Sequence, residues 1–361
     1  MARGVDMTKR MLLLSRYTRL GASSRLRTMQ YRQFLERAGF SFDVAPFFDD
    51  RYLTDLYTNG TGKPSPLPHV GRRLATLRRR PRPDAIWIEY EALPWFPWFV
   101  ENALLPRGVP IVADYDDAVF HRYDRHRLAP VRWLLGGKID GVMRRSALVV
   151  AGNAYLAERA QGAGARRIET VPTVVDLDSY TVASRPAGSA LRVGWIGTPE
   201  TWAAFARETC DTLLPVLEPH DATFVAVGAG LTPERQGRLD IQPWSEETEV
   251  TQIQSMDIGI MPLTDTPWAR GKCGYKLIQY MACGLPVVAS PVGVNAEIVE
   301  HGVNGFLART DDEWREAIST LLSDADLRRR MGAAGRRKVE ERYSLQVWGP
   351  RVAEMIAEVA G

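Results

Sequence analysis

The chain of 361 residues has little of what marks a secreted, zinc-binding or membrane-spanning protein. Its three cysteines, Cys210, Cys273 and Cys283, have no paired spacing, which argues against a disulfide framework and a zinc knuckle. No apolar run approaches the roughly 20 residues that cross a bilayer, and the apolar stretch 11–14 is too short for a signal peptide. These absences predict a cytoplasmic protein.

Lysine is also scarce, because only 6 of the 46 basic residues are lysine. Two of the six, Lys272 and Lys276, lie four residues apart, which makes this segment stand out. The net charge of +3 is unevenly distributed: residues 1–180 contain 28 basic and 19 acidic residues, and residues 181–361 contain 18 and 24. The two halves therefore differ in the sign of their charge, which favours different partners.

Length and hydrophobic patterning predict two α/β domains in a globular protein that is 45% apolar and 25% charged. Short apolar runs alternate with helical patterns, which is typical of doubly wound parallel sheets. The strands expected before the linker at 179–190 are 11–15, 42–46, 85–89, 109–113 and 149–152. Those expected after it are 191–196, 223–227, 258–261, 286–289 and 305–307. Helices are expected at 200–217, 311–322, 324–331 and 345–359.

The segment from Lys272 to Val288 has the pattern of a phosphate-binding turn followed by a helix and a strand. A helix N-terminus offers backbone N–H groups to an anion, and a lysine in the first turn adds a positive charge. Gln279 lies one turn further on the same face and can bond a sugar hydroxyl. The groups expected at the phosphate are the amides of Cys273, Gly274 and Tyr275 and the ammonium of Lys276. The alternative is an ordinary helix with solvated lysines.

Several segments, in order, resemble family 4 of the glycosyltransferases, within the GT-B superfamily. The matching segments are 171–176, 192–198, 257–262, 272–288, 290–293 and 302–307. The resemblance implies a GT-B fold with two Rossmann-like domains facing across a cleft: an acceptor domain, 1–180, and a nucleotide-sugar donor domain, 181–343. It also implies that a C-terminal helix, 344–361, packs back on the acceptor domain, and that the anomeric configuration is retained with no metal and no cofactor.

The sequence departs from this family at two places, which suggests a divergent branch. Gly271 and Gln279 occupy the positions of the family's paired glutamates, which contact the donor sugar and the ribose. Thr198, Glu200 and Thr201 lie where many members have an arginine and a lysine on the diphosphate. We expect Arg270, Lys272 and Lys276 to supply that charge, and Asp265, Lys272 or Cys273 to select the sugar. The full expected donor set is Gly21, Ser23, Arg25, Gly197, Thr198, Trp244, Lys272, Cys273, Gly274, Tyr275 and Gln279.

Two members of this set carry their own alternatives. Trp244 is expected to stack on the nucleobase, although it can equally be a core residue. The loop Gly21–Arg25 resembles the family's small-residue loop that approaches the phosphates, with Arg25 or Arg27 as their partner. A plain strand–helix turn is the alternative there.

Carboxylates in the first half are candidates for work on the acceptor. Asp116 falls where the family often has a histidine, and Asp116 and Asp117, with Lys276, are the expected catalytic residues. Asp114 and Asp116 also fit the metal motif of the GT-A fold, but that fold leaves the second half unexplained, so no metal is expected. The residues expected to bind the acceptor are Glu89, Glu91 and His121. The alternatives are a solvated loop for the glutamates and a packing role for the histidine.

The basic run 72–82, followed by the aromatic run 93–105, suggests peripheral contact with the inner face of a membrane. The alternative is a solvated arginine helix beside an aromatic core, and nucleic-acid binding is disfavoured. The expected function is transfer of a sugar from a nucleotide-diphosphate sugar to a hydroxyl of a glycan, a lipid-linked acceptor or a small molecule. UDP, GDP and dTDP remain open. The other functions considered are a non-catalytic nucleotide-binding partner and a nucleotide-sugar epimerase of GT-B fold.

Overall fold

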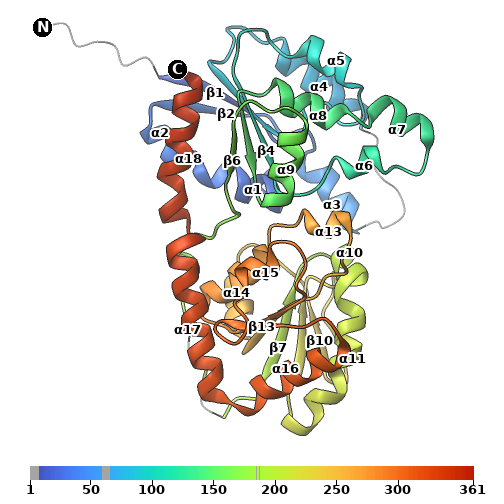
Figure 1. Ribbon diagram of the computed structural model, residues 1–361, viewed down its shortest axis with the longest axis vertical. Helices are drawn as coiled ribbons and strands as arrows, with labels where there is room; N and C mark the ends of the chain where they lie inside the picture. Colours follow the sequence, from blue (N-terminus) through green and yellow to red (C-terminus); the bar gives the residue numbers. More distant parts are fainter. Residues whose placement is uncertain (1–7, 59–65, 184, 187) are drawn as a thin grey trace, which may run out of the picture. The chain divides into compact units, whose positions relative to one another are not determined.

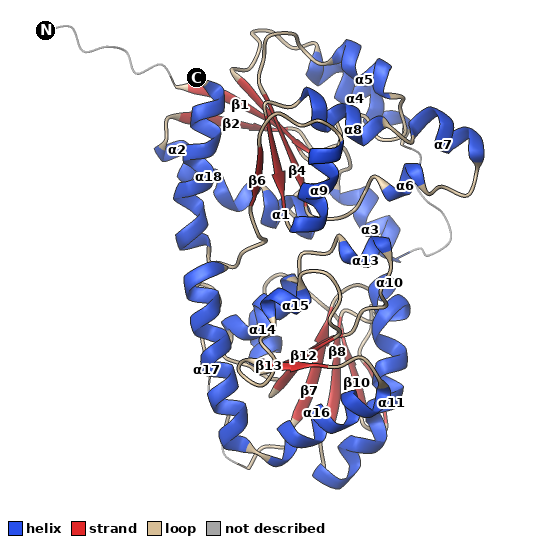
Figure 2. Ribbon diagram, in the orientation of Figure 1, coloured by secondary structure: helices blue, strands red, loops and turns tan. Residues whose placement is uncertain are grey.

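The computed structural model describes residues 8–58, 66–183, 185–186 and 188–361. Their contacts divide the chain into unit 1, which comprises Met1–Thr173 and Trp348–Gly361, and unit 2, Val174–Val347. Each unit is an α/β domain with its own sheet (Figures 1 and 2). The division falls at Thr173 rather than after residue 180, and unit 1 takes up the chain again at Trp348 rather than at residue 344.

Unit 1 is built on a six-stranded parallel sheet with the order β2-β1-β3-β4-β5-β6. Its strands are β1 (Lys9–Leu14), β2 (Phe40–Val44), β3 (Ala85–Glu89), β4 (Ile111–Tyr115), β5 (Leu148–Ala151) and β6 (Ile168–Thr170). Every residue of β3, β4 and β5 is buried, as expected where helices cover both faces of a parallel sheet. The short β6, only half-buried, was not expected from the sequence.

The helices of unit 1 are mostly short. They are α1 (Ala22–Arg27), α2 (Arg32–Arg37), α3 (Asp50–Thr58), α4 (Leu67–Leu77), α5 (Trp98–Leu104), α6 (His121–Asp124), α7 (Ala129–Leu135), α8 (Lys138–Arg145) and α9 (Ala154–Gly162). The C-terminal helix α18 (Leu345–Ala360) begins in unit 2 and continues through unit 1. In unit 1 it packs closely on α2, because a Cβ atom at Gly349 would lie 2.4 Å from the Phe34 ring.

Unit 2 has a seven-stranded sheet with the order β13-β12-β11-β7-β8-β10-β9, parallel except for β9. Its strands are β7 (Arg192–Ile196), β8 (Thr223–Val227), β9 (Glu234–Gln236), β10 (Leu239–Gln242), β11 (Ile258–Met261), β12 (Val287–Ala289) and β13 (Gly305–Leu307). Its helices are α10 (Pro199–Thr201), α11 (Arg207–Leu217), α12 (Glu249–Gln254), α13 (Pro267–Arg270), α14 (Tyr275–Ala282), α15 (Asn295–Ile298), α16 (Asp311–Ser323) and α17 (Ala325–Arg342). A π-helical turn, Trp202–Ala206, interrupts the helix expected at 200–217.

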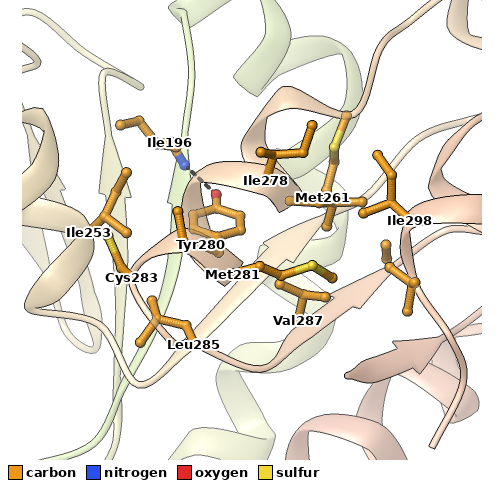
Figure 3. Packing of buried hydrophobic residues seen from close by; sticks show 14 of the residues in the cluster. Ile196, Ile253, Met261, Ile278, Tyr280, Met281, Cys283, Leu285, Val287 and Ile298 are labelled. Carbon is orange, nitrogen blue, oxygen red and sulfur yellow. Dashed lines mark hydrogen bonds between the residues drawn. The ribbon is translucent and has the colours of Figure 1, made fainter. Parts of the chain in front are cut away.

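Alternate residues of the strands in unit 2 feed two cores, one on each face of the sheet. Val225 and Val227 join the cluster around α14, whereas Phe224 and Ala226 join the cluster around α11 and α16. Figure 3 shows the first cluster, in which Tyr280 of α14 lies among aliphatic side chains. This period of two is the signature of a strand with both faces buried.

The strand orders also locate the places where a ligand can bind. In unit 1 the chain moves outward from β1 to β2 and then resumes with β3 on the other side of β1. In unit 2 it moves from β7 through β8 to β10 and resumes with β11 on the other side of β7. Doubly wound sheets bind ligands at the carboxyl ends of the strands at such switch points. Among the described residues, no helix combines the length and the apolarity needed to cross a membrane.

Candidate functional site

The turn before α14 is shaped by Gly274, which has a φ of +66°. A Cβ atom at this position would lie 2.3 Å from Cδ1 of Ile298, so both the backbone conformation and the space require glycine. The first helical bond joins the N–H of Leu277 to the carbonyl of Gly274 at 3.0 Å. The helix therefore starts at Tyr275, slightly later than predicted, and its first-turn amides lie at residues 275 and 276.

Lys276 lies in this first turn and is half-buried. Its Nζ atom is 5.5 Å from the ring centroid of Trp195, a buried residue of β7. One helical turn further, the hydroxyl of Tyr280 accepts a 3.0 Å hydrogen bond from the N–H of Ile196 (Figure 3). These two contacts fasten the start of α14 to the end of β7, so Lys276 lies near the strand that leads into Gly197 and Thr198.

Glycines allow the segments that follow β7, β8 and β10 to approach one another closely at the carboxyl edge of the sheet in unit 2. A Cβ atom at Gly228, after β8, would lie 2.2 Å from the carbonyl oxygen of Gly197 and 3.2 Å from Cβ of Trp244. Gly197 itself has ring atoms of Trp195 2.6 Å from its Cβ position. The expected donor residues of unit 2 thus come together, but Thr198 uses its hydroxyl to cap α10, accepting from the Thr201 N–H.

A buried network connects Trp244 and Gln279 to a carboxylate that sequence reasoning missed. The indole Nε1 of Trp244 donates to Oε2 of Glu249 at 2.7 Å, and the hydroxyl of Tyr180 donates to Oε1 of the same carboxylate. Nε2 of Gln279 donates to the Tyr180 hydroxyl at 2.8 Å, and the Tyr275 hydroxyl is 3.3 Å from it. Gln279 is 3% exposed, so part of the amide expected to bind a sugar hydroxyl is instead bonded within unit 2.

Of the cations expected around the turn at Gly274, one is already paired with a carboxylate. Arg270 makes two hydrogen bonds to Asp265, at 2.7 and 2.9 Å, and this pairing lowers the pKa of the Asp265 carboxyl. Its charge is therefore compensated, and Asp265 is likewise engaged. Cys273 is buried and lies with its sulfur 3.9 Å from the carbonyl of Gly271. Lys272 and Lys276, the other two cations expected at the diphosphate, are both half-buried.

At the switch point of unit 1, Glu89 ends β3 as a buried carboxylate. Its Oε2 accepts from the Arg16 N–H at 2.8 Å and from the Ser24 hydroxyl at 2.5 Å. Burial raises the pKa of the Glu89 carboxyl to about 7. Gly21 begins α1 beside it, where a Cβ atom would lie 2.4 Å from Cβ of Tyr17. The small-residue loop is therefore tightly packed against the end of β1.

Asp116 follows β4 and accepts a hydrogen bond from the hydroxyl of Tyr90. Tyr90 has a φ of +64° and also lies with its hydroxyl 3.3 Å from that of Ser23. Burial and the charge of Asp117 raise the pKa of the Asp116 carboxyl, and both aspartates are half-buried. The strained tyrosine conformation at this edge is a feature common at functional sites.

Asp114 does not form a metal-binding pair with Asp116. Its carboxylate is paired with Arg27 in a buried salt bridge of 2.8 Å, and Arg27 also donates to the carbonyl of Val171 at 2.8 Å. Arg27 therefore has a structural role. Arg25, the other candidate for a phosphate, is also buried, with Nη1 3.4 Å from the carbonyl of Arg19.

Glu91 and His121 have structural partners rather than open faces. The carboxylate of Glu91 pairs with Nζ of Lys138 at 2.6 Å and accepts from the Tyr123 hydroxyl at 2.8 and 2.9 Å. The two ring nitrogens of His121 contact Oδ1 of Asp124 at 2.9 Å and the Tyr155 hydroxyl at 2.8 Å. We therefore leave both residues out of the candidate acceptor site.

Two participants, Tyr180 and Glu249, have no signal in the sequence that identifies them. Tyr180 lies within the expected linker, and Glu249 opens a short helix. Glu249 joins Trp244, five residues before it, to Tyr180, 69 residues before it, so no local spacing marks the whole network. Tyr90, between Glu89 and Glu91, takes a left-handed conformation that tyrosine rarely adopts.

Parts of this chain are similar in sequence to known proteins. Residues 191–324 match the family model described as glycosyl transferases group 1. Spore coat protein SA of Bacillus subtilis is 37% identical over 84 residues, which are 22% of this chain and 21% of that protein. A GDP-mannose-dependent monoacylated alpha-(1-6)-phosphatidylinositol monomannoside mannosyltransferase of Corynebacterium glutamicum is 27% identical over 216 residues, 52% of this chain and 55% of that protein. The chain thus spans about a fifth to about half of these relatives.

The whole chain resembles a solved structure. Anabaena Alr3699/HepE, crystallised with UDP and glucose, superposes with a TM-score of 0.71 at 18% identity, over 97% of this chain and 100% of that one. This likeness, together with the two doubly wound units, establishes the GT-B fold.

Proposed function

We propose that this chain, a GT-B protein whose residues 191–324 match the glycosyl transferases group 1 model, moves a sugar from a nucleotide-diphosphate sugar to a hydroxyl acceptor. The observation that carries the proposal is the turn at Gly274, which presents the first-turn amides of α14 and Lys276 at the switch-point edge of unit 2. Unit 2 binds the donor, and unit 1 binds the acceptor.

Stabilising the leaving diphosphate is the main catalytic demand of such a transfer. Lys276 supplies a positive charge whose position is restrained by the Trp195 ring, and the first-turn amides supply hydrogen-bond donors. Lys272 adds a second cation three residues before the helix begins. This set needs no resident metal, and the pairing of Asp114 with Arg27 removes one carboxylate of the metal motif that the sequence contains.

The proteins that this chain resembles differ in the nucleotide of their donors. Alr3699/HepE was solved with UDP and with UDP-glucose, and the mannosyltransferase relative is named for GDP-mannose. In unit 2, Trp244 lies beside Gly228 at the carboxyl edge and is partly exposed, and we assign its ring to the nucleobase. On unit 1, Asp116 and Asp117 are the groups we assign to the acceptor hydroxyl, with retention of the anomeric configuration.

The decisive experiment replaces the first-turn lysine. Lys276→Ala is expected to lower kcat/KM at least 100-fold, because it removes a charge that acts on the leaving group, while the melting temperature stays close to that of wild type. Release of UDP, GDP or dTDP from a panel of sugar donors, with an acceptor mixture, measures the reaction. Lys338→Ala, on α17 of the same unit, is the matched control and should retain turnover. Wild-type turnover in Lys276→Ala would overturn the assignment.

A second candidate function is nucleotide binding without transfer. It is favoured by Gly271, which has no side chain where the family has a carboxylate, and by the internal bonding of Gln279. Tight nucleotide binding by the wild type, with no donor hydrolysis or transfer, would support it.

We also assign a membrane-facing surface to unit 1, but not where the sequence suggested. In the basic run, Arg73 is 2% exposed and donates to the Ser15 carbonyl at 2.8 Å, whereas the other five arginines are exposed. Trp95 and Phe99 of the aromatic run are exposed, and a further group of exposed apolar side chains lies on and before α7, at Leu128, Trp133 and Leu134. We call these three residues, with Arg125, Arg127 and Arg132, the α7 surface.

A further inference from the structure

The hydrogen bonds around Glu249 have a fixed direction, because each partner has few choices. An indole N–H can only donate, so Trp244 donates to Glu249. The Tyr180 hydroxyl has one proton, which it donates to the other oxygen of the same carboxylate, and it accepts the amide N–H of Gln279. The chain of bonds therefore runs from Gln279 through Tyr180 to Glu249, with Trp244 donating from the other side.

This network contains one negative charge, and it is buried. Glu249 is 8% exposed and Gln279 is 3% exposed, so a second carboxylate here would lie in the same low-dielectric surroundings. Tyr180 cannot donate its single proton to two carboxylates at once. Position 279 therefore needs a neutral side chain because position 249 already carries the negative charge.

The network also holds together the parts of unit 2 that we assign to the nucleotide. Trp244 belongs to the loop after β10, and Gln279 lies one turn beyond the start of α14. Tyr275, the first residue of α14, has its hydroxyl 3.3 Å from that of Tyr180. Both the ring offered to the base and the turn that carries Lys276 are thus connected to the Glu249 carboxylate.

We propose that Glu249 and Tyr180 are positioning residues of the nucleotide site, and that Glu249 provides on α12 the single carboxylate for which position 279 must stay neutral. The inference rests on the proposed function for its nucleotide part. It accounts for the departure at Gln279, because the charge has moved to another helix, 30 residues earlier in the chain.

An exchange of the two side chains tests this inference. Gln279→Glu leaves two carboxylates facing the single proton of the Tyr180 hydroxyl. It is expected to lower the melting temperature and to weaken nucleotide binding at least tenfold. Glu249→Gln removes the anion and is expected to weaken nucleotide binding about tenfold. In the double variant the phenol donates to the new carboxylate at position 279 and accepts from the new amide at position 249, whose carbonyl accepts from Trp244. Its nucleotide binding is expected to return to within about threefold of wild type.

The measurements are thermal unfolding of the full chain and calorimetric titration with UDP, GDP and dTDP. Glu247→Gln makes the same chemical change at an exposed position of the same segment and should leave both quantities unchanged. If the double variant loses affinity by the product of the two single fold-losses, the inference is overturned. It is also overturned if Gln279→Glu has the melting temperature and the affinity of wild type. A merely structural carboxylate would lower stability without this rescue of affinity.

The design separates this inference from the proposed function. If the wild type binds none of the three nucleotides, the function fails, and the melting temperatures still report whether the two positions exchange their charge. If Gln279→Glu does not fold, the comparison is between Glu249→Gln and the double variant. In that comparison the double variant must have the higher melting temperature, and a lower melting temperature overturns the inference.

Discussion

The buried carboxylate of Glu89 makes the stability of unit 1 depend on pH. Burial raises its pKa from 4.5 to about 7. Below pH 4.5 the folded and unfolded chains both hold the proton; between pH 4.5 and 7 the unfolded chain releases a proton that the folded chain keeps. The free energy of unfolding therefore falls as pH rises through this window, by about 3 kcal/mol at most if about 1.4 kcal/mol corresponds to each pKa unit.

Glu89→Gln is accordingly expected to flatten the dependence of the unit 1 melting temperature on pH. The amide keeps an oxygen that can accept from Arg16 and Ser24. The variant should match wild type near pH 5 and exceed it near pH 8, as measured by thermal unfolding across that range. Asp114, whose pKa burial raises to about 6, is present in both proteins, so the difference between the two curves isolates Glu89. Parallel curves would contradict the prediction.

The roles of residues were predictable from the sequence only where neighbouring residues in the chain determine them. The turn at Gly274 and the lysine after it are read directly from spacing, and the structure places both at the carboxyl edge of the sheet. Gln279 was expected to face a ligand, but its partner Tyr180 is 99 residues away, and no periodicity encodes so distant a hydrogen bond. Nucleotide binding by these side chains stays a prediction.

At the scale of elements, buried strands were predicted well because their apolar runs are continuous. Strands β3, β8, β11 and β13 have the bounds that the sequence indicates. The missed strands, β6, β9 and β10, are short and incompletely buried, so hydrophobicity does not mark them. Helix α17 was predicted to end at Met331, just before Gly332, but it continues to Arg342. The glycine instead allows close packing, since a Cβ atom there would lie 1.9 Å from the Gly284 carbonyl oxygen.

The turn that opens α14 should tolerate no side chain. Gly274→Ala is expected to destabilise unit 2 by about 2–4 kcal/mol, because it adds a strained positive φ and a clash with Ile298. Gly302→Ala is the matched control: its φ is +81°, but nothing lies within 4 Å of the Cβ position, so it should cost only the conformational part, about 1 kcal/mol. Denaturant unfolding of both variants measures the difference, and equal losses would show that Ile298 yields to the methyl group.

On the scale of the whole molecule, charge is divided between the two units. Unit 1 contains 29 basic and 19 acidic residues, whereas unit 2 contains 17 and 24. Helix α7, which carries most of the α7 surface, lies at the edge of unit 1 (Figure 1). Trp133 is 85% exposed there, next to Leu134, and Arg132 donates to the carbonyls of His126 and Arg127. Exposed apolar side chains beside arginines fit the interface of an anionic bilayer.

Trp133→Ser combined with Leu134→Ser should therefore weaken binding to vesicles that contain phosphatidylglycerol at least tenfold. Inserting these two side chains removes apolar area from water, and each fully buried side chain contributes about 2 kcal/mol. Vesicles of phosphatidylcholine alone should bind the wild type weakly, and added salt should reduce binding to anionic vesicles, because the arginines act through charge. Leu231→Ser, an exposed leucine of unit 2, is the matched control and should bind as wild type does. Equal binding of the double variant and the wild type in a sedimentation assay would show that the α7 surface does not bind membranes. That outcome would not affect sugar transfer to a soluble acceptor.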